Sequence, residues 1–135
     1  MIERVLVPID GGALDAKAFA MSIALAHQLG AAITGFIVEP FNVAPTHRSD
    51  ASLQAHAHGI LDRFERLARE AGVPFERAVT QATVVTEAIL AAAREHRCDM
   101  IVMATRGRGV VSELLWGSHT REVMSGTDLP VLVLH

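Results

Sequence analysis

The feature that most constrains the fold of this chain is the alternation of short apolar runs with longer segments of helical periodicity. Apolar runs of strand length occupy Val5 to Ile9, Ile33 to Val38, Met100 to Met103 and Leu129 to Leu134. Strands that alternate with helices form βαβ units, in which the strands are parallel and the helices cover the sheet. We therefore expect one doubly wound α/β domain over residues 1–135, with helices on both faces of a parallel sheet.

Four helices are expected from apolar spacing and capping residues. The first runs from Leu14 to Leu29 and the second from Ser49 or Asp50 to about Ala71, and a glycine suited to a helix C-terminus follows each. The third runs from Thr83 or Val84 to near His96, and a short fourth begins at Ser118. The apolar stripe expected for the first helix consists of Leu14, Ala18, Met21, Leu25 and Leu29.

A fifth strand and a long connection complete the expected layout. Phe75 to Thr80 has the mixed polarity of a strand at a sheet edge. Gly35, inside the second strand, indicates close packing or a backbone that a ligand approaches. Glu39 to Asp50 contains two prolines and forms the longest irregular connection.

Composition excludes several classes of function. Twelve basic and fifteen acidic residues give a net charge of -3, and the chain has no basic stripe with interleaved aromatics, so we expect no nucleic-acid partner. No apolar stretch approaches the roughly 18 residues that cross a membrane, and no export signal is evident. The single cysteine, Cys98, cannot form an internal disulfide. We expect a soluble cytoplasmic protein in which Cys98 packs in the core.

A glycine-rich loop after the fourth strand carries the strongest functional signal. Gly107 and Gly109 allow the backbone to approach a ligand, and Ser118 is a strong N-cap residue for the last helix. A helix N-terminus beside such a loop favours phosphate. Three arginines lie between Thr105 and Arg121 against one acid, so this stretch is locally positive.

The expected fold places this loop beside a second turn. Ligands of doubly wound domains bind at the carboxyl ends of the strands, where the winding changes direction. The segments there are Asp10-Gly11-Gly12, after the first strand, and Thr105 to Gly109, after the fourth.

These residues resemble the universal stress protein family. Its nucleotide-binding members carry a glycine, two residues, a second glycine, nine residues, and then glycine with serine or threonine. Here Gly107 is followed by nine residues and by Gly117-Ser118. The resemblance extends over nearly the whole chain, through the blocks RVLVPIDGG, AILAAAREHRCDMIVMATRGRG and LPVLVLH.

The resemblance implies a fold, a ligand and an assembly. The fold is a five-stranded sheet of order 3-2-1-4-5, the ligand is ATP with Mg²⁺, and the assembly is a homodimer through the C-terminal strand, with other protein partners unknown. The implied adenine and ribose contacts are Pro8, Asp10, Ile37 or its neighbour Val38, Met103 and Ala104. The implied phosphate contacts, with the glycine loop, are Gly107, Gly109, Gly117, Ser118 and the main chain of His119.

One departure from the family pattern leaves two functions open. Ala104 occupies the position of the first glycine and puts a methyl group where backbone and ligand approach closely. The first hypothesis is a stress-response regulator that binds ATP, in which hydrolysis or self-phosphorylation is slow at most because no general base is evident. The alternative is a dimeric interaction module of the same fold that binds no nucleotide.

Other chemistries fit the sequence less well. The chain has no GxxxxGK[ST] motif and no GxSxG nucleophile elbow, and the glycine loop follows the fourth strand where a dinucleotide fingerprint would follow the first. His56 and His58 are two residues apart on a helix and therefore point to different faces, so we expect solvated histidines and no metal site. No catalytic residue is assigned.

Overall fold

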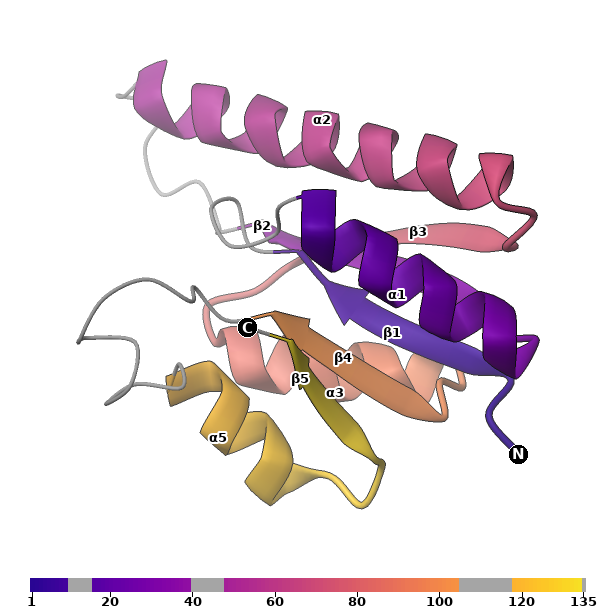
Figure 1. Ribbon diagram of the computed structural model, residues 1–135. Coiled ribbons are helices and arrows are strands. Elements are labelled where there is room, and N and C mark those ends of the chain that lie inside the picture. Colours follow the sequence, from indigo (N-terminus) through magenta and orange to yellow (C-terminus); the bar gives the residue numbers. More distant parts are fainter. Residues whose placement is uncertain (10–15, 40–47, 105–117, 135) are drawn as a thin grey trace.

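The computed structural model describes residues 1–9, 16–39, 48–104 and 118–134 (Figure 1). Strands and helices alternate along these parts of the chain, as the apolar pattern predicted. The elements in order are β1 (Arg4–Pro8), α1 (Ala16–Leu29), β2 (Ala32–Glu39), α2 (Arg48–Glu70), β3 (Phe75–Gln81), α3 (Val85–Glu95), β4 (Met100–Ala104), α5 (Ser118–Gly126) and β5 (Val131–Leu134).

The five strands form one parallel sheet of order β3-β2-β1-β4-β5, which confirms the expected fold. In the register, Val5 lies beside Ile33 of β2 and Met100 of β4, so β1 is central. Its interior residues are buried on both faces, as the continuous apolar run required. β3 lies at an edge of the sheet, as its mixed polarity predicted.

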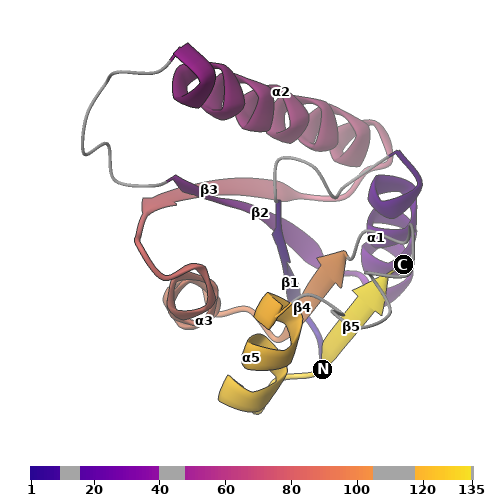
Figure 2. The ribbon, with the colours of Figure 1, turned by 90° about the vertical axis from the view of Figure 1, so that its left-hand side faces the viewer.

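The helices cover the two faces in pairs (Figure 2). On one face, Phe19 of α1 stacks on Phe64 of α2, with ring centroids 4.7 Å apart. On the other face, Ile89 of α3 and Val123 of α5 pack with Leu6 of β1 in a second core cluster. Along each strand, side chains point alternately into the core cluster beneath α1 and α2 and into the one beneath α3 and α5. The sheet is therefore the middle of three layers.

The stripe predicted for α1 is only partly the one that is buried: Ala18 is in the core and Leu25 packs against it, while Leu14 lies outside the described residues. Phe19 and Ile23 face the core, whereas Met21 is 45% exposed and Leu29 is 38% exposed. The first helix is apolar on most of its surface, so periodicity alone does not select its buried side. The large Phe19 ring, which stacks against α2, decides the orientation. For α3, by contrast, the four predicted core residues are all buried: Ala88, Ile89, Ala92 and Ala93.

Three helices end with the same hydrogen-bonded turn. At the end of α1, the Gly30 N–H donates to the His27 carbonyl and the Ala31 N–H to the Ala26 carbonyl. This pair of bonds is a Schellman motif, whose last residue but one adopts a left-handed conformation. The same motif ends α2 at Gly72 and α3 at Arg97, with φ angles of 65°, 76° and 53° at Gly30, Gly72 and Arg97.

Gly35 is required by close packing between β2, α2 and β3. A Cβ atom at this position would lie 2.5 Å from Cζ of Phe75 and 2.7 Å from Cδ1 of Leu61. Of the two readings that the sequence left open, the structure supports close packing.

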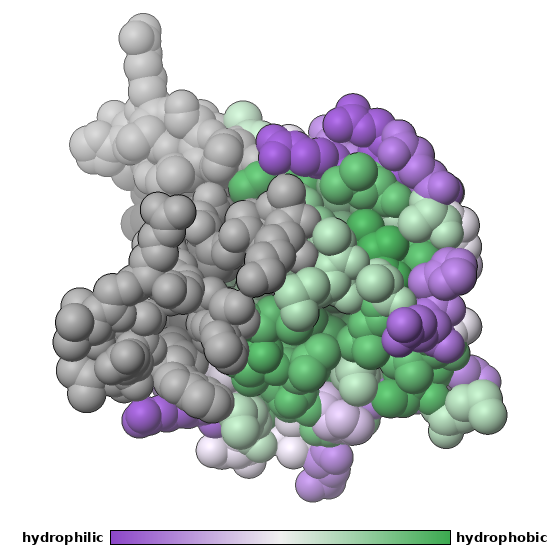
Figure 3. All heavy atoms as spheres, in the orientation of Figure 1, coloured by the Kyte–Doolittle hydropathy of each residue, from purple (hydrophilic) through white to green (hydrophobic). Residues whose placement is uncertain are grey.

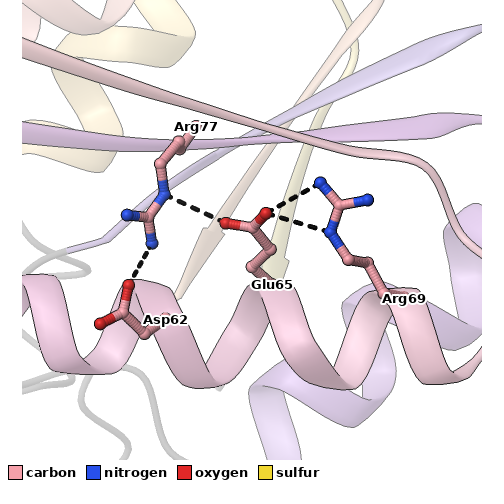
Figure 4. A network of polar contacts seen from close by, with 4 residues as sticks. All are labelled: Asp62, Glu65, Arg69 and Arg77. Atoms are coloured by element: carbon pink, nitrogen blue, oxygen red, sulfur yellow. Dashed lines mark hydrogen bonds and ion pairs between the residues drawn. The ribbon is translucent and has the colours of Figure 1, made fainter.

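A polar network holds α2 against the edge strand β3 (Figure 4). Glu65 accepts two hydrogen bonds from Arg69 through Oε2, at 3.0 and 2.9 Å, and its Oε1 lies 3.1 Å from Nε of Arg77. The Arg77 guanidinium also donates to Asp62. Charged residues on β3 discourage pairing with another strand at this edge.

The opposite edge of the sheet is apolar. β5 has the sequence VLVL, and Leu132 is 36% exposed. In the space-filling view, apolar residues gather over α1 and across the middle of the same face (Figure 3). β5 begins at Val131, so the start predicted for this strand, Leu129, was two residues early. Pro130 has no N–H to donate to a ladder and marks the boundary.

The amino ends of β1 and β4 are joined by Asp99. Its carboxylate accepts the backbone N–H groups of Glu3 at 2.8 Å and Arg4 at 3.1 Å, and its own N–H donates to the Arg4 carbonyl at 2.8 Å. Cys98, the preceding residue, is buried as predicted.

Within the described ranges, no helix combines the length and apolarity needed to span a membrane.

Candidate functional site

The carboxyl ends of β1 and β4 define the candidate site. From β1 the chain moves to β2 and β3 on one side, and β4 then pairs with β1 on its other side. The winding therefore changes direction between β1, which ends at Pro8, and β4, which ends at Ala104. Neighbouring parallel strands end at the same edge, so the structure confirms that the segments after the first and fourth strands start side by side. Open α/β sheets bind ligands at such a switch point.

Two predicted contacts lie at this edge with accessible surface. Pro8 and Ala104, the last residues of their strands, are both half-buried. Ile9 follows Pro8, and its N–H donates to the Phe36 carbonyl at 2.7 Å, which fixes the end of β1 against β2. Both strand ends therefore keep some accessible surface, and the end of β1 is bonded to β2.

The other two predicted strand residues are buried. Ile37 is 2% exposed and belongs to the core between the sheet and α1 and α2, whereas its neighbour Val38 is half-buried and packs on the opposite face. Met103 is 7% exposed and packs in the cluster beneath α3 and α5. Of the two alternatives on β2, Val38 has the more accessible side chain.

Helix α5 begins at Ser118, where the sequence placed a helix start. Its first turn contains no acidic residue, so no carboxylate there competes for the positive end of the helix dipole. Thr120 and Val123 are buried, and Glu122 accepts a hydrogen bond of 2.6 Å from the Thr86 hydroxyl of α3. These contacts fix the helix against its neighbour. The side chains of Ser118 and His119 lie outside the described residues.

The remaining predicted contacts also lie outside the described residues: Asp10, Gly107, Gly109 and Gly117. Their roles stay predictions.

A polar pair at the end of β2 was missed by the sequence analysis. Nε2 of His58, on α2, lies 2.6 Å from Oε1 of Glu39, the last residue of β2. The expectation of a solvated His58 is met only in part: its side chain is 40% exposed, and the packing of α2 across the sheet also brings it to a carboxylate 19 residues away. Glu39 ends a mostly buried strand, and its polar side chain at that position is the signal that the sequence offers. Among the described residues, no group of three or more His, Cys, Asp or Glu side chains could hold a metal ion.

The fold and its switch point define a doubly wound α/β domain with a site at the carboxyl edge of the sheet. The sequence pattern of the Universal stress protein family matches residues 1–135. A curated relative from Thermus aquaticus, described as "Universal stress protein in QAH/OAS sulfhydrylase 3'region", is 32% identical, and the match covers 99% of each chain. The chain belongs to the universal stress protein family.

Solved structures agree with this assignment at the level of the fold. A universal stress protein from Archaeoglobus fulgidus in complex with dAMP has a TM-score of 0.69 and 18% identity, with all of both chains covered. A universal stress protein in complex with cAMP has a TM-score of 0.72 and 22% identity, over 99% of this chain and 97% of that chain.

Proposed function

We propose that this chain is a cytoplasmic stress-response regulator that binds an adenine nucleotide, ATP with Mg²⁺, at the carboxyl edge of the sheet. The observation that carries the proposal is the meeting of β1 and β4 at the switch point, with the acid-free N-terminus of α5 following β4. A helix N-terminus presents unpaired backbone N–H groups, which suit phosphate oxygens. Binding is the function, and hydrolysis is slow at most.

The accessible strand ends support the adenosine half of the site. Pro8, Ala104 and Val38 leave apolar and backbone surface at the edge, which suits a purine ring and a ribose. Met103 and Ile37 support that surface from the two cores. Asp10 would accept hydrogen bonds from the amino or hydroxyl groups of the nucleoside.

The phosphate half of the site rests on backbone groups. Gly107, Gly109, Gly117, Ser118 and the His119 main chain would donate N–H groups to the phosphate oxygens. Mg²⁺ usually binds through phosphates and only one or two carboxylates, so it would arrive with the nucleotide and needs no protein cage. The cAMP and dAMP complexes of relatives with the same fold support an adenine ligand.

Calorimetric titration of the nucleotide-free protein with Mg-ATP tests the proposal, with AMP and GTP as comparison ligands. We expect saturable binding of ATP in preference to GTP. The variant Gly117→Asp puts a carboxylate beside the phosphates, and we expect it to weaken ATP binding at least about tenfold, a loss of roughly 1.4 kcal/mol.

A matched control keeps the charge change but moves it away from the site. Ser125 is exposed near the C-terminal end of α5, so Ser125→Asp adds the same charge to the same helix at its other end. This variant should bind ATP as the parent protein does. Absence of binding at millimolar ATP by correctly folded protein would reject the site and favour the dimeric interaction module.

We also propose a homodimer through β5. An apolar edge strand without charged residues invites pairing, and a second copy can cover it by an isologous contact. The charged network on β3 protects the other edge, so β5 is the edge available for assembly.

A further inference from the structure

A groove lies at the amino edge of the sheet, opposite the proposed nucleotide site. It has a volume of about 400 Å³ and lies between α3 and the turn that joins α5 to β5. This volume is in the range of small-molecule sites, which usually have apolar walls and a few polar groups. The apolar wall here consists of Leu90, Ala93 and Leu129.

The residues that line the groove include two arginines and one aspartate. Arg94 and Arg97 are both exposed and lie on one side of the groove, and Asp128 lies on the other side. Across the described ranges, neither arginine forms an ion pair, whereas Arg69 and Arg77 are each bonded to acidic side chains. The groove therefore has a net positive charge and cations available for an anion.

The backbone of Arg97 is the second observation. Its φ angle of 53° falls in the left-handed region, which is costly for a residue with a side chain. The equivalent positions after α1 and α2 are occupied by Gly30 and Gly72. The helix end that lines the groove is thus the one of these three that carries a cation in place of glycine, and such backbone outliers concentrate at functional sites.

The floor of the groove is uncharged and tightly built. Gly126 lies so close to α3 that an added Cβ atom would be 2.7 Å from Cδ1 of Leu90. The Thr127 hydroxyl accepts the Leu129 N–H at 3.1 Å, which fixes the turn. Cys98 is buried there, and burial raises the pKa of its thiol, so this side chain is neutral at pH 7.

We propose that this groove binds a small aliphatic carboxylate. Arg94 and Arg97 pair with the carboxylate, and the hydrocarbon chain packs on Leu90, Ala93 and Leu129. The apolar wall requires a hydrocarbon part and the two unpaired guanidinium groups require an anion, so neither a neutral lipid nor free phosphate satisfies both halves of the groove.

Titration of the full-length protein with octanoate, followed by amide NMR shifts and by calorimetry, tests this proposal. We expect saturable binding that perturbs the amides of Leu90, Ala93 and Leu129. The variants Arg97→Gly and Arg94→Gln should each weaken binding at least tenfold. Arg97→Gly also relieves the left-handed backbone, so this variant is expected to fold, and its amide NMR spectrum checks this directly.

Three comparisons make the result decisive. Arg63→Gln removes an exposed arginine on α2, across the sheet from the groove, and should bind octanoate as the parent protein does. Inorganic phosphate and 1-octanol should each bind at least tenfold more weakly than octanoate. The proposal is overturned by an absence of saturation, by unchanged affinity in the two groove variants, by an equal loss in Arg63→Gln, or by phosphate binding as tightly as octanoate.

Discussion

At the residue scale, Gly35 shows how a single missing side chain sets the distance between layers. Phe75 and Leu61 occupy the space that a Cβ atom would need. Phe75 also packs edge-on against Phe64, with ring centroids 5.2 Å apart, so it has little room to move.

Substitution Gly35→Ala should therefore lower the free energy of unfolding by about 1–3 kcal/mol, as other overpacked cores do. Urea denaturation measures this change. Gly59 of α2 provides the matched control, because a Cβ atom there would meet no other atom within 4 Å. Since alanine favours a helix more than glycine, Gly59→Ala should raise the stability by about 1 kcal/mol. Equal effects of the two substitutions would refute the packing argument.

Cys98 links stability to alkaline pH. Burial raises the pKa of the thiol in the folded protein, opposed in part by the positive charge of Arg4. Above about pH 8.5, the ordinary pKa of a thiol, the unfolded chain loses this proton while the folded chain keeps it. The free energy of unfolding should thus be unaffected by this group below about pH 8 and fall as the pH rises above it.

Denaturation curves at pH 7, 9 and 10 test the linkage, with Cys98→Ala as the control. The chain has no tyrosine and one lysine, Lys17, so few other groups titrate in this range. The alanine variant should lose most of the pH dependence. A parent protein whose stability rises between pH 8 and 10 would contradict the assignment.

At the element scale, α1, α2 and α3 all end in a Schellman motif, but the residue in the left-handed position differs. Glycine occupies the left-handed position after α1 and α2, and Arg97 occupies it after α3. The residues that follow are Ala31, Val73 and Cys98, all buried, so each turn also directs the chain into the core.

This comparison predicts opposite effects of reciprocal substitutions. Gly72→Ala should lower the free energy of unfolding by about 1 kcal/mol, because alanine has a Cβ atom in the left-handed conformation. Arg97→Gly should raise it by up to about 1 kcal/mol for the same reason. Thermal or urea unfolding of the two variants checks both signs. A destabilised Arg97→Gly would show that contacts of the arginine outweigh the backbone strain.

Much of this element structure could be predicted from the sequence. The four apolar strand runs, the polar edge strand and the glycines after α1 and α2 all act locally, so their pattern is visible in the chain. The buried side of α1 could be predicted only in part: Ala18 and Leu25 face the core as expected, whereas the place of Phe19 depends on its stacking against Phe64 of α2. The Glu39–His58 pair likewise depends on how α2 crosses the sheet. For the candidate site, the topology confirms that the carboxyl ends of the first and fourth strands lie side by side. The role of the glycine loop stays a prediction from the sequence.

At the scale of the whole molecule, the two outer strands of the sheet, β3 and β5, differ in how they resist pairing with a strand of another molecule. β3 presents charged side chains, whereas β5 presents an apolar one at Leu132. Leu132→Lys should raise the dissociation constant of the proposed dimer at least about 100-fold, because each copy would bury an unpaired charge.

Light scattering across a dilution series measures this effect. Val79 of β3 is 43% exposed on the other edge, so Val79→Lys makes the same chemical change where no partner is proposed. It should leave the dimer intact. A parent protein that is monomeric at micromolar concentration, or a dimer lost equally in both variants, would contradict an assembly through β5.

The most direct test of the central claim is an amide NMR titration with Mg-ATP, because it reports where the nucleotide binds. The amides that should shift lie at the carboxyl edge: Ile9, Val38, Ala104 and the first turn of α5. Those at the amino edge, such as Arg4 and Asp99, should not move. Saturable shifts confined to the carboxyl edge are the predicted result. Shifts centred on the amino edge, or none at millimolar ATP, would contradict the account.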